Sequence, residues 1–499
     1  MESLDRELLL SEKSKAGRTG FSLPKLDVPR KALDSLFPAG YLRKTEPGLP
    51  EISENEVQRH YVRISTKNYH IDKNMYPLGS CTMKYNPKIN EKAASLPGTF
   101  NIHPLAPDAA SQGALQIQYE LKEMLREIGG MHEVSLQPAA GSQGELTGIM
   151  LFKKYHEVHG NHHKKYILVP DSAHGTNPAS VTISGYEVIN IKSNSGGLTD
   201  MEHLKSKLTD EVAGMMLTNP STVGLFESQI VEIQKLVHEV GGLMYMDGAN
   251  LNALLGLARP GDMGFDVVHF NLHKTFSTPH GGGGPGSGPI GVSDKVSPYL
   301  PRPEIKYDGS RYYQDYSNTE SIGKVHSFYG SFGMMVRAWV YIRMHGAKGL
   351  KRISENAILN ANYILHRLKD HYDLPFDGPV MHEVVFSGSR QKRQNGIKTL
   401  DIAKRILDYG YHAPTIYFPL IVPECIMIEP TESEAKENID GFCDAMIAIA
   451  DEAVNNPEIV KTAPHNAGTR RLDDAYAAKN INVRWQSGSR DAVRESELA

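Results

Sequence analysis

The chain has 499 residues, of which 40% are hydrophobic and 22% are charged, so it is long enough for more than one core and has the composition of a globular protein. A formal net charge of -4 and an isoelectric point of about 6.6 give no global reason to expect nucleic acid or an anionic membrane as a partner. The three cysteines, Cys81, Cys425 and Cys443, are far apart and form no C-x-x-C pair, which argues against a disulfide framework or a structural zinc site.

The first segment, residues 1–95, is rich in Pro, Lys and Asn and has little periodicity, so we expect an extended arm that packs over something else. It begins with MESLDRELLL, whose short leucine patch is too small for a signal peptide, and no run of about 18 apolar residues is seen along the chain. We therefore expect a cytoplasmic protein without a membrane span.

Residues 96–325 change to short apolar runs separated by helical stretches, which is typical of a large α/β domain with a mostly parallel sheet. Four runs, YILVP, GMMLT, LMYM and VVHFNL, are each followed by polar residues. Ligands of such sheets bind at the carboxyl ends of the strands. We therefore expect four side chains to converge there, namely His174, Asn219, Asp247 and Lys274.

Ahead of these strands, AAGSQGELTGIM places a turn of small residues before a helix. Its Leu146, Ile149 and Met150 have the spacing of one helical face. The backbone N–H groups of Gly141, Ser142 and Gln143 could hold a phosphate at the helix N-terminus, although Ser142 and Gln143 could instead only cap the helix.

Lys274 is followed by a glycine run, Gly281 to Gly284. A phosphate-binding P-loop has its glycines before the lysine, so the reversed order here argues against one. A solvated surface lysine and a flexible linker are the ordinary alternatives. The three other polar strand ends favour a functional lysine instead.

The remaining chain is predicted to form a small α+β domain, residues 326–455, and a surface-wrapping extension, residues 456–499. A buried helical face is expected at Ala361, Ile364, Leu365 and Leu368, and strands at VMHEVVFSG and TIYFPLIV.

The four strand-end residues suit pyridoxal phosphate, which needs a lysine for an imine, an acid at the pyridine nitrogen, a stacking surface and a phosphate cup. Lys274 and Asp247 supply the first two, and His174 could stack on the ring or be an ordinary loop histidine. Asn219 could bind the phenolic oxygen, and His273 could join the phosphate turn. The histidines of HEVHGNHHKK lack recognised ligand spacing, so we expect a solvated loop and no metal site.

Several long motifs resemble the P-protein family of the glycine cleavage system, in particular the second subunit of its two-subunit bacterial form. They are GRTGFSLPKLDVP, MYPLGSCTMKYNPKIN, LQPAAGSQGELTG, PDSAHGTNPAS, MYMDGANLNAL, NLHKTFSTPHGGGGPG and RRLDDAYAAK. The resemblance implies a fold-type-I pyridoxal-phosphate enzyme with a seven-stranded-type sheet. It also implies a partner subunit 1 in a hetero-oligomer, glycine as substrate, release of CO2, and transfer of the aminomethyl group to a lipoylated H-protein.

The candidate site therefore has catalytic residues and cofactor-binding residues. The first are Lys274, Asp247 and His174, and the second are Gly141, Ser142, Gln143, Asn219, Ala249 and His273. Lys and Asp alone would also fit an aminotransferase, a group II decarboxylase or a cysteine desulfurase. A noncatalytic scaffold subunit would require neither residue.

Two questions stay open at this point. Ser80, Cys81, Thr82 and Lys84 of the segment 75–87 could line an entrance to the site, or the segment could simply pack at a subunit boundary, which we favour slightly. An arginine would be the usual partner of the substrate carboxylate, and Arg302, Arg311 and Arg337 are equal candidates.

Overall fold

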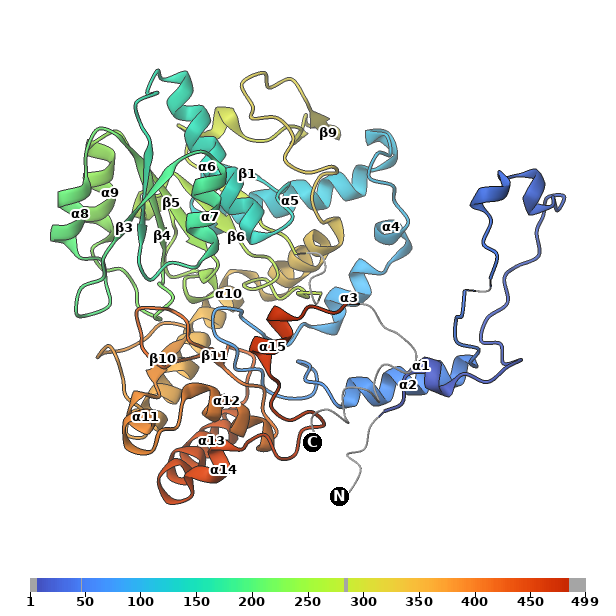
Figure 1. Cartoon of the computed structure of the whole chain (residues 1–499). Helices are drawn as coiled ribbons and strands as arrows, with labels where there is room; N and C mark the ends of the chain where they lie inside the picture. Colours follow the sequence, from blue (N-terminus) through green and yellow to red (C-terminus); the bar gives the residue numbers. More distant parts are fainter. Residues whose placement is uncertain (1–6, 46, 282–285, 484–499) are drawn as a thin grey trace. The chain divides into compact units, whose positions relative to one another are not determined.

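The computed structural model describes residues 7–45, 47–281 and 286–483, and they fall into two compact units. The smaller unit comprises Met1–Lys67 and Thr462–Ala499, and the larger comprises Asn68–Lys461 (Figure 1). The division expected from the sequence, at residues 95, 325 and 455, stays a prediction. None of the helices within the described ranges has the length and apolar character needed to cross a lipid bilayer.

The smaller unit contains short helices joined by extended chain. They are α1 (Leu10–Lys13), the 3-10 helices Leu33–Ser35 and Ala39–Tyr41, α2 (Glu54–Thr66) and α15 (Asp474–Lys479). In α2, Arg63 donates from Nε to Glu7 at 3.0 Å, and Arg18 pairs with Glu56 at 2.5 Å. Most apolar side chains of residues 21–41 are exposed, so this unit has little core of its own.

The larger unit is built on a seven-stranded sheet with the order β1-β7-β6-β5-β4-β2-β3. Strand β7 runs antiparallel to both of its neighbours, β1 and β6, and the pairings among β6, β5, β4, β2 and β3 are parallel. The strands are β1 (Glu133–Ser135), β2 (Tyr166–Pro170), β3 (Glu187–Ile191), β4 (Val212–Thr218), β5 (Leu243–Gly248), β6 (Val267–Phe270) and β7 (Ile290–Val292). The mostly parallel α/β sheet expected from the sequence is confirmed, and its four predicted strands are neighbours.

Alternate residues of the central strands point to opposite faces of the sheet, because the side-chain period of a strand is two. In β5, Met244 and Met246 join one buried cluster, whereas Tyr245 joins another. Each face is covered by helices. The sheet region contains α5 (Gln112–Gly129), α6 (Gly141–Val158), α7 (Thr176–Ile183), α8 (Met201–Lys207), α9 (Ile230–Glu239) and the 3-10 helices Asp108–Ala110, Leu251–Ala253, Gly261–Met263 and Ser297–Tyr299.

Helices α6 and α7 pack on the face of Tyr245, and α5, α8 and α9 pack on the face of Met244. Helix α6 buries only part of the face expected from the sequence, because Ile149 is 0% exposed whereas Met150 is 36% exposed. Its buried side also includes Gly148, where an added Cβ would lie 2.2 Å from the Tyr245 ring. Small residues in α6 therefore allow close contact with the sheet.

A second core surrounds a three-stranded sheet with the order β10-β12-β11. It comprises β10 (Val384–Ser387), β11 (Thr415–Ile416), β12 (Cys425–Ile428), α11 (Ser389–Asn395), α12 (Thr399–Asp408), α13 (Lys436–Asn455) and α14 (Pro457–Lys461). The expected strand TIYFPLIV is mostly wrong, because only its first two residues are paired and Tyr417 has a left-handed φ of 58°. The central strand, CIMI, was not expected.

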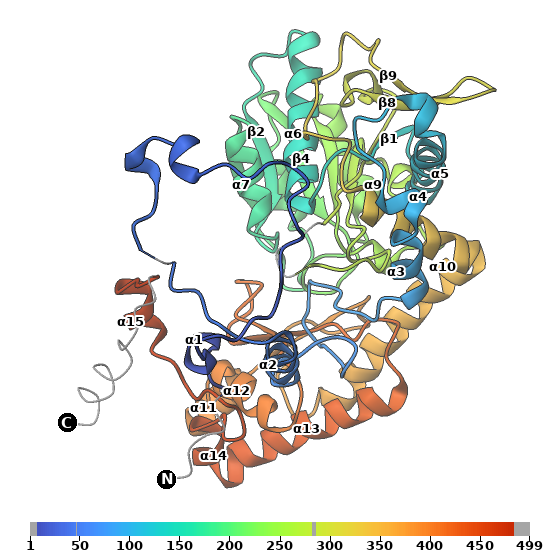
Figure 2. The same cartoon turned by 90° about the vertical axis from the view of Figure 1, so that its right-hand side faces the viewer.

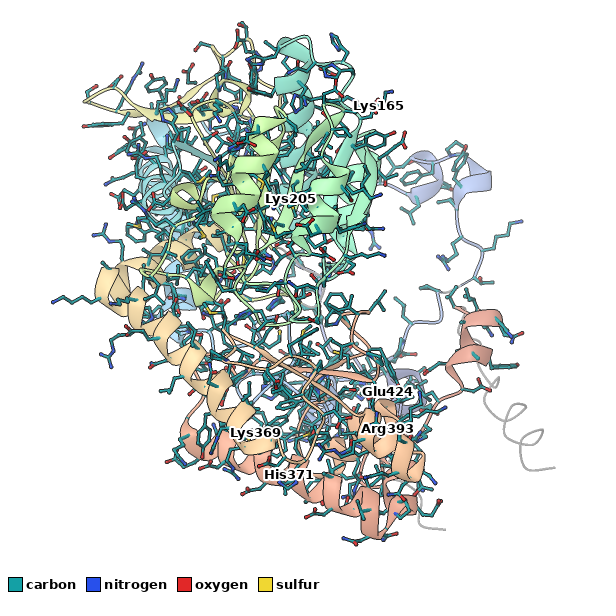
Figure 3. All side chains as sticks on the ribbon, turned by 90° about the vertical axis from the view of Figure 1, so that its left-hand side faces the viewer. Lys165, Lys205, Lys369, His371, Arg393 and Glu424 are labelled. Carbon is teal, nitrogen blue, oxygen red and sulfur yellow. The ribbon has the colours of Figure 1, made fainter. Side chains whose placement is uncertain are left out.

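One helix, α10 (Phe332–Leu368), contributes to both cores (Figure 2). Met335 and Ala338 near its start belong to the sheet core, and Ala361, Ile364 and Leu368 near its end belong to the second core, as predicted. Gly346 interrupts the helix with φ 60° and ψ -179°. Figure 3 labels several charged side chains, among them Lys205 of α8, Arg393 of α11 and Glu424, which precedes β12.

The remaining elements of this unit are α3 (Lys88–Ala94), α4 (Pro97–Phe100) and the hairpin of β8 (Glu304–Tyr307) and β9 (Tyr312–Asp315). The histidine-rich stretch 156–165 is only partly the solvated loop that the sequence indicated. His156 lies in α6, is 2% exposed and contacts the carbonyl of Ala213 through Nε2 at 2.8 Å. Lys164 is also buried and donates to three backbone carbonyls.

Candidate active site

A cavity of about 260 Å³ lies at the carboxyl ends of the central strands. It is lined by residues from β5, from the segments that follow β2 and β6, and from the start of α6. Those used below are Ser80, Gly141, Ser142, Glu145, His174, Thr176, Asp247, Ala249, His269, Asn271, His273 and Lys274. The cavity thus brings together three of the four polar side chains that the strand-end pattern predicted.

Asp247 is the buried acid of this cavity and is 3% exposed. Its Oδ1 accepts a hydrogen bond from the backbone N–H of Ala249 at 3.0 Å, and its Oδ2 accepts one from Asn177 at 3.0 Å. Burial alone would raise the pKa of this carboxyl, but His269 and these two hydrogen bonds outweigh burial and lower the pKa. Asp247 is therefore ionised at neutral pH.

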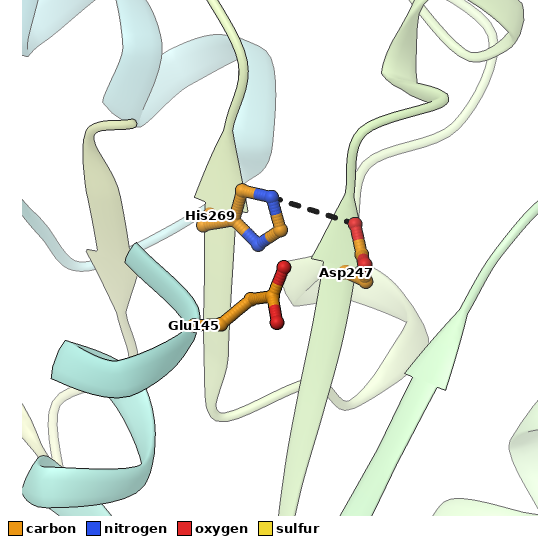
Figure 4. A group of neighbouring side chains, drawn as sticks. All are labelled: Glu145, Asp247 and His269. Carbon is orange, nitrogen blue, oxygen red and sulfur yellow. Dashed lines mark ion pairs between the residues drawn. The ribbon is translucent and has the colours of Figure 1, made fainter. Parts of the chain in front are cut away.

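His269 of β6 lies directly beside Asp247, with Nε2 3.4 Å from Oδ1 (Figure 4). Its Nδ1 is 2.7 Å from the hydroxyl of Tyr245. Burial lowers the pKa of His269, so the ring is neutral and accepts the tyrosine proton at Nδ1. The Nε2 proton then faces the carboxylate, and this orientation supports the negative charge of Asp247.

Glu145 of α6 faces Asp247 and His269 in the same group (Figure 4). Thr176 donates to its Oε1 at 2.8 Å and Ser180 donates to its Oε2 at 3.2 Å. Burial, together with the charge of Asp247, raises the pKa of Glu145 to about 7. The pKa values of the two carboxyl groups are thus separated. Asp247 is charged at neutral pH, and Glu145 is able to exchange a proton near neutral pH.

The N-terminus of α6 opens into the cavity at Gly141 and Ser142. Ala140 precedes it in extended conformation, and no side chain of the described residues caps the helix. A Cβ on Gly141 would lie 2.6 Å from Oδ1 of Asn271, so only glycine permits this close approach. The 18-residue helix therefore directs free N–H groups and the positive end of its dipole toward the cavity.

Lys274 follows β6 and is partly buried. Within the described ranges its ammonium has no hydrogen-bond or ion-pair partner, in contrast with buried Lys84, which has three. Next to it, His273 lines the cavity, and burial and the charge of Lys274 lower the pKa of His273 to about 3. His273 is therefore neutral, and the Lys274 nitrogen beside it stays available to react with a ligand.

His174 lies at the solvent-facing side of the cavity, after β2. Its Nδ1 is 2.9 Å from Oγ1 and 3.3 Å from the backbone N of Thr176, so this residue holds the ring. The same threonine donates to Glu145. His174 is therefore oriented by a residue that also contacts the buried acid group.

Two predicted residues do not line the cavity. Asn219 is fully buried, and its Oδ1 accepts the backbone N–H of Glu227 at 3.0 Å. Gln143 accepts from the backbone N–H of Ala139 at 2.7 Å and donates to the carbonyl of Val325 at 2.6 Å. Their side-chain amides hold neighbouring backbone, so a phosphate role of Gln143 is confined to its backbone N–H, beside those of Gly141 and Ser142.

The three candidate arginines are also engaged elsewhere. Arg302 donates to the carbonyl of Asn318, Arg311 pairs with Asp308, and Arg337 forms a two-point contact with Glu91. No arginine is among the described residues that line the cavity. The usual carboxylate partner of an amino-acid enzyme is thus missing from this set.

Segment 75–87 contributes to the cavity through Ser80. Lys84 fixes the segment to the chain after Lys274, because it donates to the carbonyl of Thr275 at 2.9 Å and pairs with Glu432 at 2.7 Å. Burial raises the pKa of Cys81, so this thiol is a poor nucleophile at neutral pH. The glycine run lies largely outside the described residues.

Sequence reasoning missed Glu145, His269, Asn177 and Thr176. Two of them had a detectable signal, since Glu145 lies one turn after Gly141 and His269 is a polar residue inside the apolar run VVHF. Asn177 and Thr176 lie in the motif that was used for His174. Their roles depend on which side chains meet across elements, and one sequence does not give that information.

The donor set fits pyridoxal phosphate. The cavity is lined by an ionised acid and by a lysine whose ammonium has no partner among the described residues, and an uncapped helix start suits an anionic group. Oδ1 of Asn271 is buried without a partner, and a Cβ on Gly141 would fill the space beside it. These features match the lysine, acid and phosphate requirements stated above.

Comparisons with known proteins point to one enzyme family. A family model described as "Glycine cleavage system P-protein" matches residues 28–303, and one described as "Glycine dehydrogenase, C-terminal domain" matches residues 353–467. The "Probable glycine dehydrogenase (decarboxylating) subunit 2" of Chloroherpeton thalassium is 61% identical over 98% of this chain and 99% of its own length. The protein with the same description from Chlorobaculum tepidum is 60% identical, over 96% and 99%.

Among solved structures, one described as glycine decarboxylase (P-protein) of the glycine cleavage system, in inhibitor-bound form, is similar with a TM-score of 0.70. The match covers 84% of this chain and 94% of that one at 17% identity. At this identity the likeness supports the fold alone, and it is the fold expected for fold-type-I enzymes.

Proposed function

The chain belongs to the glycine cleavage system P-protein family, and from this premise we propose that it is a glycine dehydrogenase (decarboxylating) subunit that binds pyridoxal phosphate at Lys274. In this function the carboxylate of glycine leaves as CO2 and the aminomethyl group passes to the lipoyl arm of the H-protein. The observation that carries the proposal is the cavity in which Lys274, ionised Asp247 and the uncapped start of α6 face one space.

Pyridoxal phosphate, when bound, supplies an electron-withdrawing ring that accepts the electrons of the broken C–C bond. Asp247 is placed to hold positive charge on the ring nitrogen, and His269 and Tyr245 behind it keep the carboxylate oriented. Gly141 and Ser142 would donate backbone N–H groups to the phosphate. Lys274 would hold the cofactor and would supply a proton-accepting or proton-donating nitrogen at its Nζ.

The lack of arginine among the described cavity residues is consistent with loss of the substrate carboxylate. A tight ion pair would stabilise the carboxylate in the ground state and would weaken as the neutral CO2 forms, which raises the barrier. Neutral donors lose less as CO2 forms. Ser80 and the uncharged His273 are the donors of this kind that we assign to the substrate side.

We infer two protein partners from the family, a subunit 1 and a lipoylated H-protein. The relatives described as subunit 2 support the first, since their descriptions imply a second chain. The H-protein follows from the reaction of the system and needs an open route to Lys274, which the solvent-facing His174 side of the cavity supplies.

The central experiment fixes the cofactor chemically. Purified chain with subunit 1 should be yellow, and borohydride should attach the cofactor to the peptide that contains Lys274. With lipoylated H-protein, labelled bicarbonate should exchange into glycine. Lys274→Ala should abolish both signals, and the exposed Lys295→Ala should abolish neither. A colourless wild type, or transamination without exchange, would contradict the proposal.

A further inference from the structure

Two fully buried glutamates face one another outside the acid group described above. Glu383 directly precedes β10 and Glu429 directly follows β12, and the pairing of Val384 with Ile428 brings the two positions side by side. Both residues are 0% exposed. An oxygen of Glu383 and one of Glu429 lie within 4.8 Å of each other. Two negative charges this close inside a protein are strongly unfavourable, so one of the carboxyl groups must carry a proton.

The glutamates hold the backbone of the loop that reaches the cavity. Oε2 of Glu383 accepts the N–H of Ser80 at 2.8 Å, and Oε2 of Glu429 accepts the N–H of Thr82 at 2.8 Å. Ser80 and Thr82 have left-handed φ values of 64° and 49°. This conformation is costly for a residue with a side chain, especially a β-branched one, and persists only where the surroundings impose it.

The hydrogen bonds show which glutamate is charged. Glu429 receives a second donor, the side-chain amide of Asn252 at 3.3 Å, whereas Oε1 of Glu383 is buried and accepts no hydrogen bond from the described residues. Burial and the charge of Glu429 raise the pKa of Glu383 well above its usual value. Burial also raises the pKa of Glu429, but its hydrogen bonds with Thr82 and Asn252 oppose that shift, and Lys274 opposes the shift of both glutamates.

We propose that Glu383 and Glu429 are positioning residues that share one proton, held by Glu383, and that this shared proton lets both buried carboxyl groups hold the loop of Ser80 and Thr82. Through Ser80 the pair shapes the wall of the cavity. This role rests on the proposed function, since it takes that cavity as the cofactor site.

The titratable and charged groups around the pair come from several elements. Lys274 follows β6, Cys81 lies in the loop between the two gripped N–H groups, His382 precedes β10, and Cys425 begins β12. Burial lowers the pKa of His382 to about 3 and raises the pKa of Cys425 to about 12, so both are neutral at physiological pH. Burial also raises the pKa of Cys81. Glu429 is therefore the ionised acid of this set.

The test is the infrared spectrum of the cofactor-free chain, which does not depend on Lys274 chemistry or on subunit 1. The carbonyl band of a protonated carboxyl should decrease in Glu383→Gln, which keeps a neutral acceptor for Ser80, and should persist in Glu429→Gln. Glu227→Gln is the control and should keep the band, because Glu227 is also buried and accepts the N–H of Thr199 at 2.8 Å.

A band that decreases in Glu383→Gln alone supports the proposal. A band that decreases only in Glu429→Gln, or one that is unchanged in all three variants, would overturn it.

The infrared result also separates the two proposals. A wild type without visible absorbance would contradict the cofactor assignment, while the infrared band would still report the shared proton. A divalent cation that copurifies in stoichiometric amount and is lost in Glu429→Gln would overturn the shared proton, because His382, Glu383 and Glu429 have ligand atoms within 4.8 Å of one another.

Discussion

Replacing Lys84 by methionine removes the charged anchor of segment 75–87. Its Nζ lies 2.7 Å from Glu432, donates to the carbonyl of Thr275 at 2.9 Å and to the hydroxyl of Tyr341 at 3.3 Å. The side chains of Lys84 and Glu432 are only 2% and 9% exposed. Methionine has a similar shape, so the variant mainly leaves the buried carboxylate of Glu432 with the Tyr341 hydroxyl as its donor at 3.0 Å.

Loss of one partner from a buried ion pair costs about 3–5 kcal/mol of unfolding free energy. Lys88→Met is the matched control, because Lys88 also pairs with a carboxylate, Asp72, at 2.6 Å, but those side chains are 59% and 43% exposed. Such a surface pair contributes about 0–1 kcal/mol. The structure therefore predicts a difference of several kcal/mol between two lysine-to-methionine changes four positions apart.

Urea unfolding followed by circular dichroism measures both variants under the same conditions. Adding Glu432→Gln to Lys84→Met should recover part of the lost stability, since the unpaired charge is then gone. Equal destabilisation by Lys84→Met and Lys88→Met would refute the reasoning, as would no recovery in the double variant.

Further predictions concern the acid group and the packing of α6. Asp247→Asn should reduce bicarbonate exchange at least about a hundredfold with the cofactor still bound. The measurement is the exchange rate divided by the visible absorbance of the bound cofactor, and unchanged exchange would remove Asp247 from the mechanism. Glu145 has a folded pKa of about 7 against an ordinary value of 4.5, so the folded protein binds more protons in that window and stability falls as pH rises through it. Glu145→Gln should remove this slope from melting temperatures measured between those pH values; an identical slope would show that other groups cause it. Gly148→Ala should destabilise by about 1–3 kcal/mol because its Cβ would overlap Tyr245, whereas Gly113→Ala in α5, with nothing within 4 Å, should be neutral or stabilising.

The parts of the fold that could be predicted were those with a strong local pattern. The runs at β2, β4, β5 and β6 are apolar and end in polar residues, so both their conformation and the edge at which Asp247 and Lys274 meet followed from the sequence. By contrast, CIMI has only four residues, and its identity as the central strand β12 depends on pairing with β10 and β11. Such pairing between distant segments leaves no local pattern.

The site shows the same limit for individual side chains. Asn219 directly follows β4, one position after the residue that pairs with Asp247, yet its Oδ1 accepts the backbone N–H of Glu227. Glu145 received no role in the prediction, although burial and the charge of Asp247 raise its carboxyl pKa to about 7. A strand end indicates where a residue lies, but only neighbours from other elements determine which way its side chain turns and which proton it holds.

Helix α10 constrains how this chain can be divided into fragments. A cut before Phe332 would remove Met335 and Ala338 from the sheet core, and a cut after Leu368 would remove Ala361 and Ile364 from the second core. Each fragment would then expose an apolar surface that the missing half of the helix covers. Expression of either core alone therefore requires its own copy of the relevant helix half, with Gly346 as the natural boundary between the two copies.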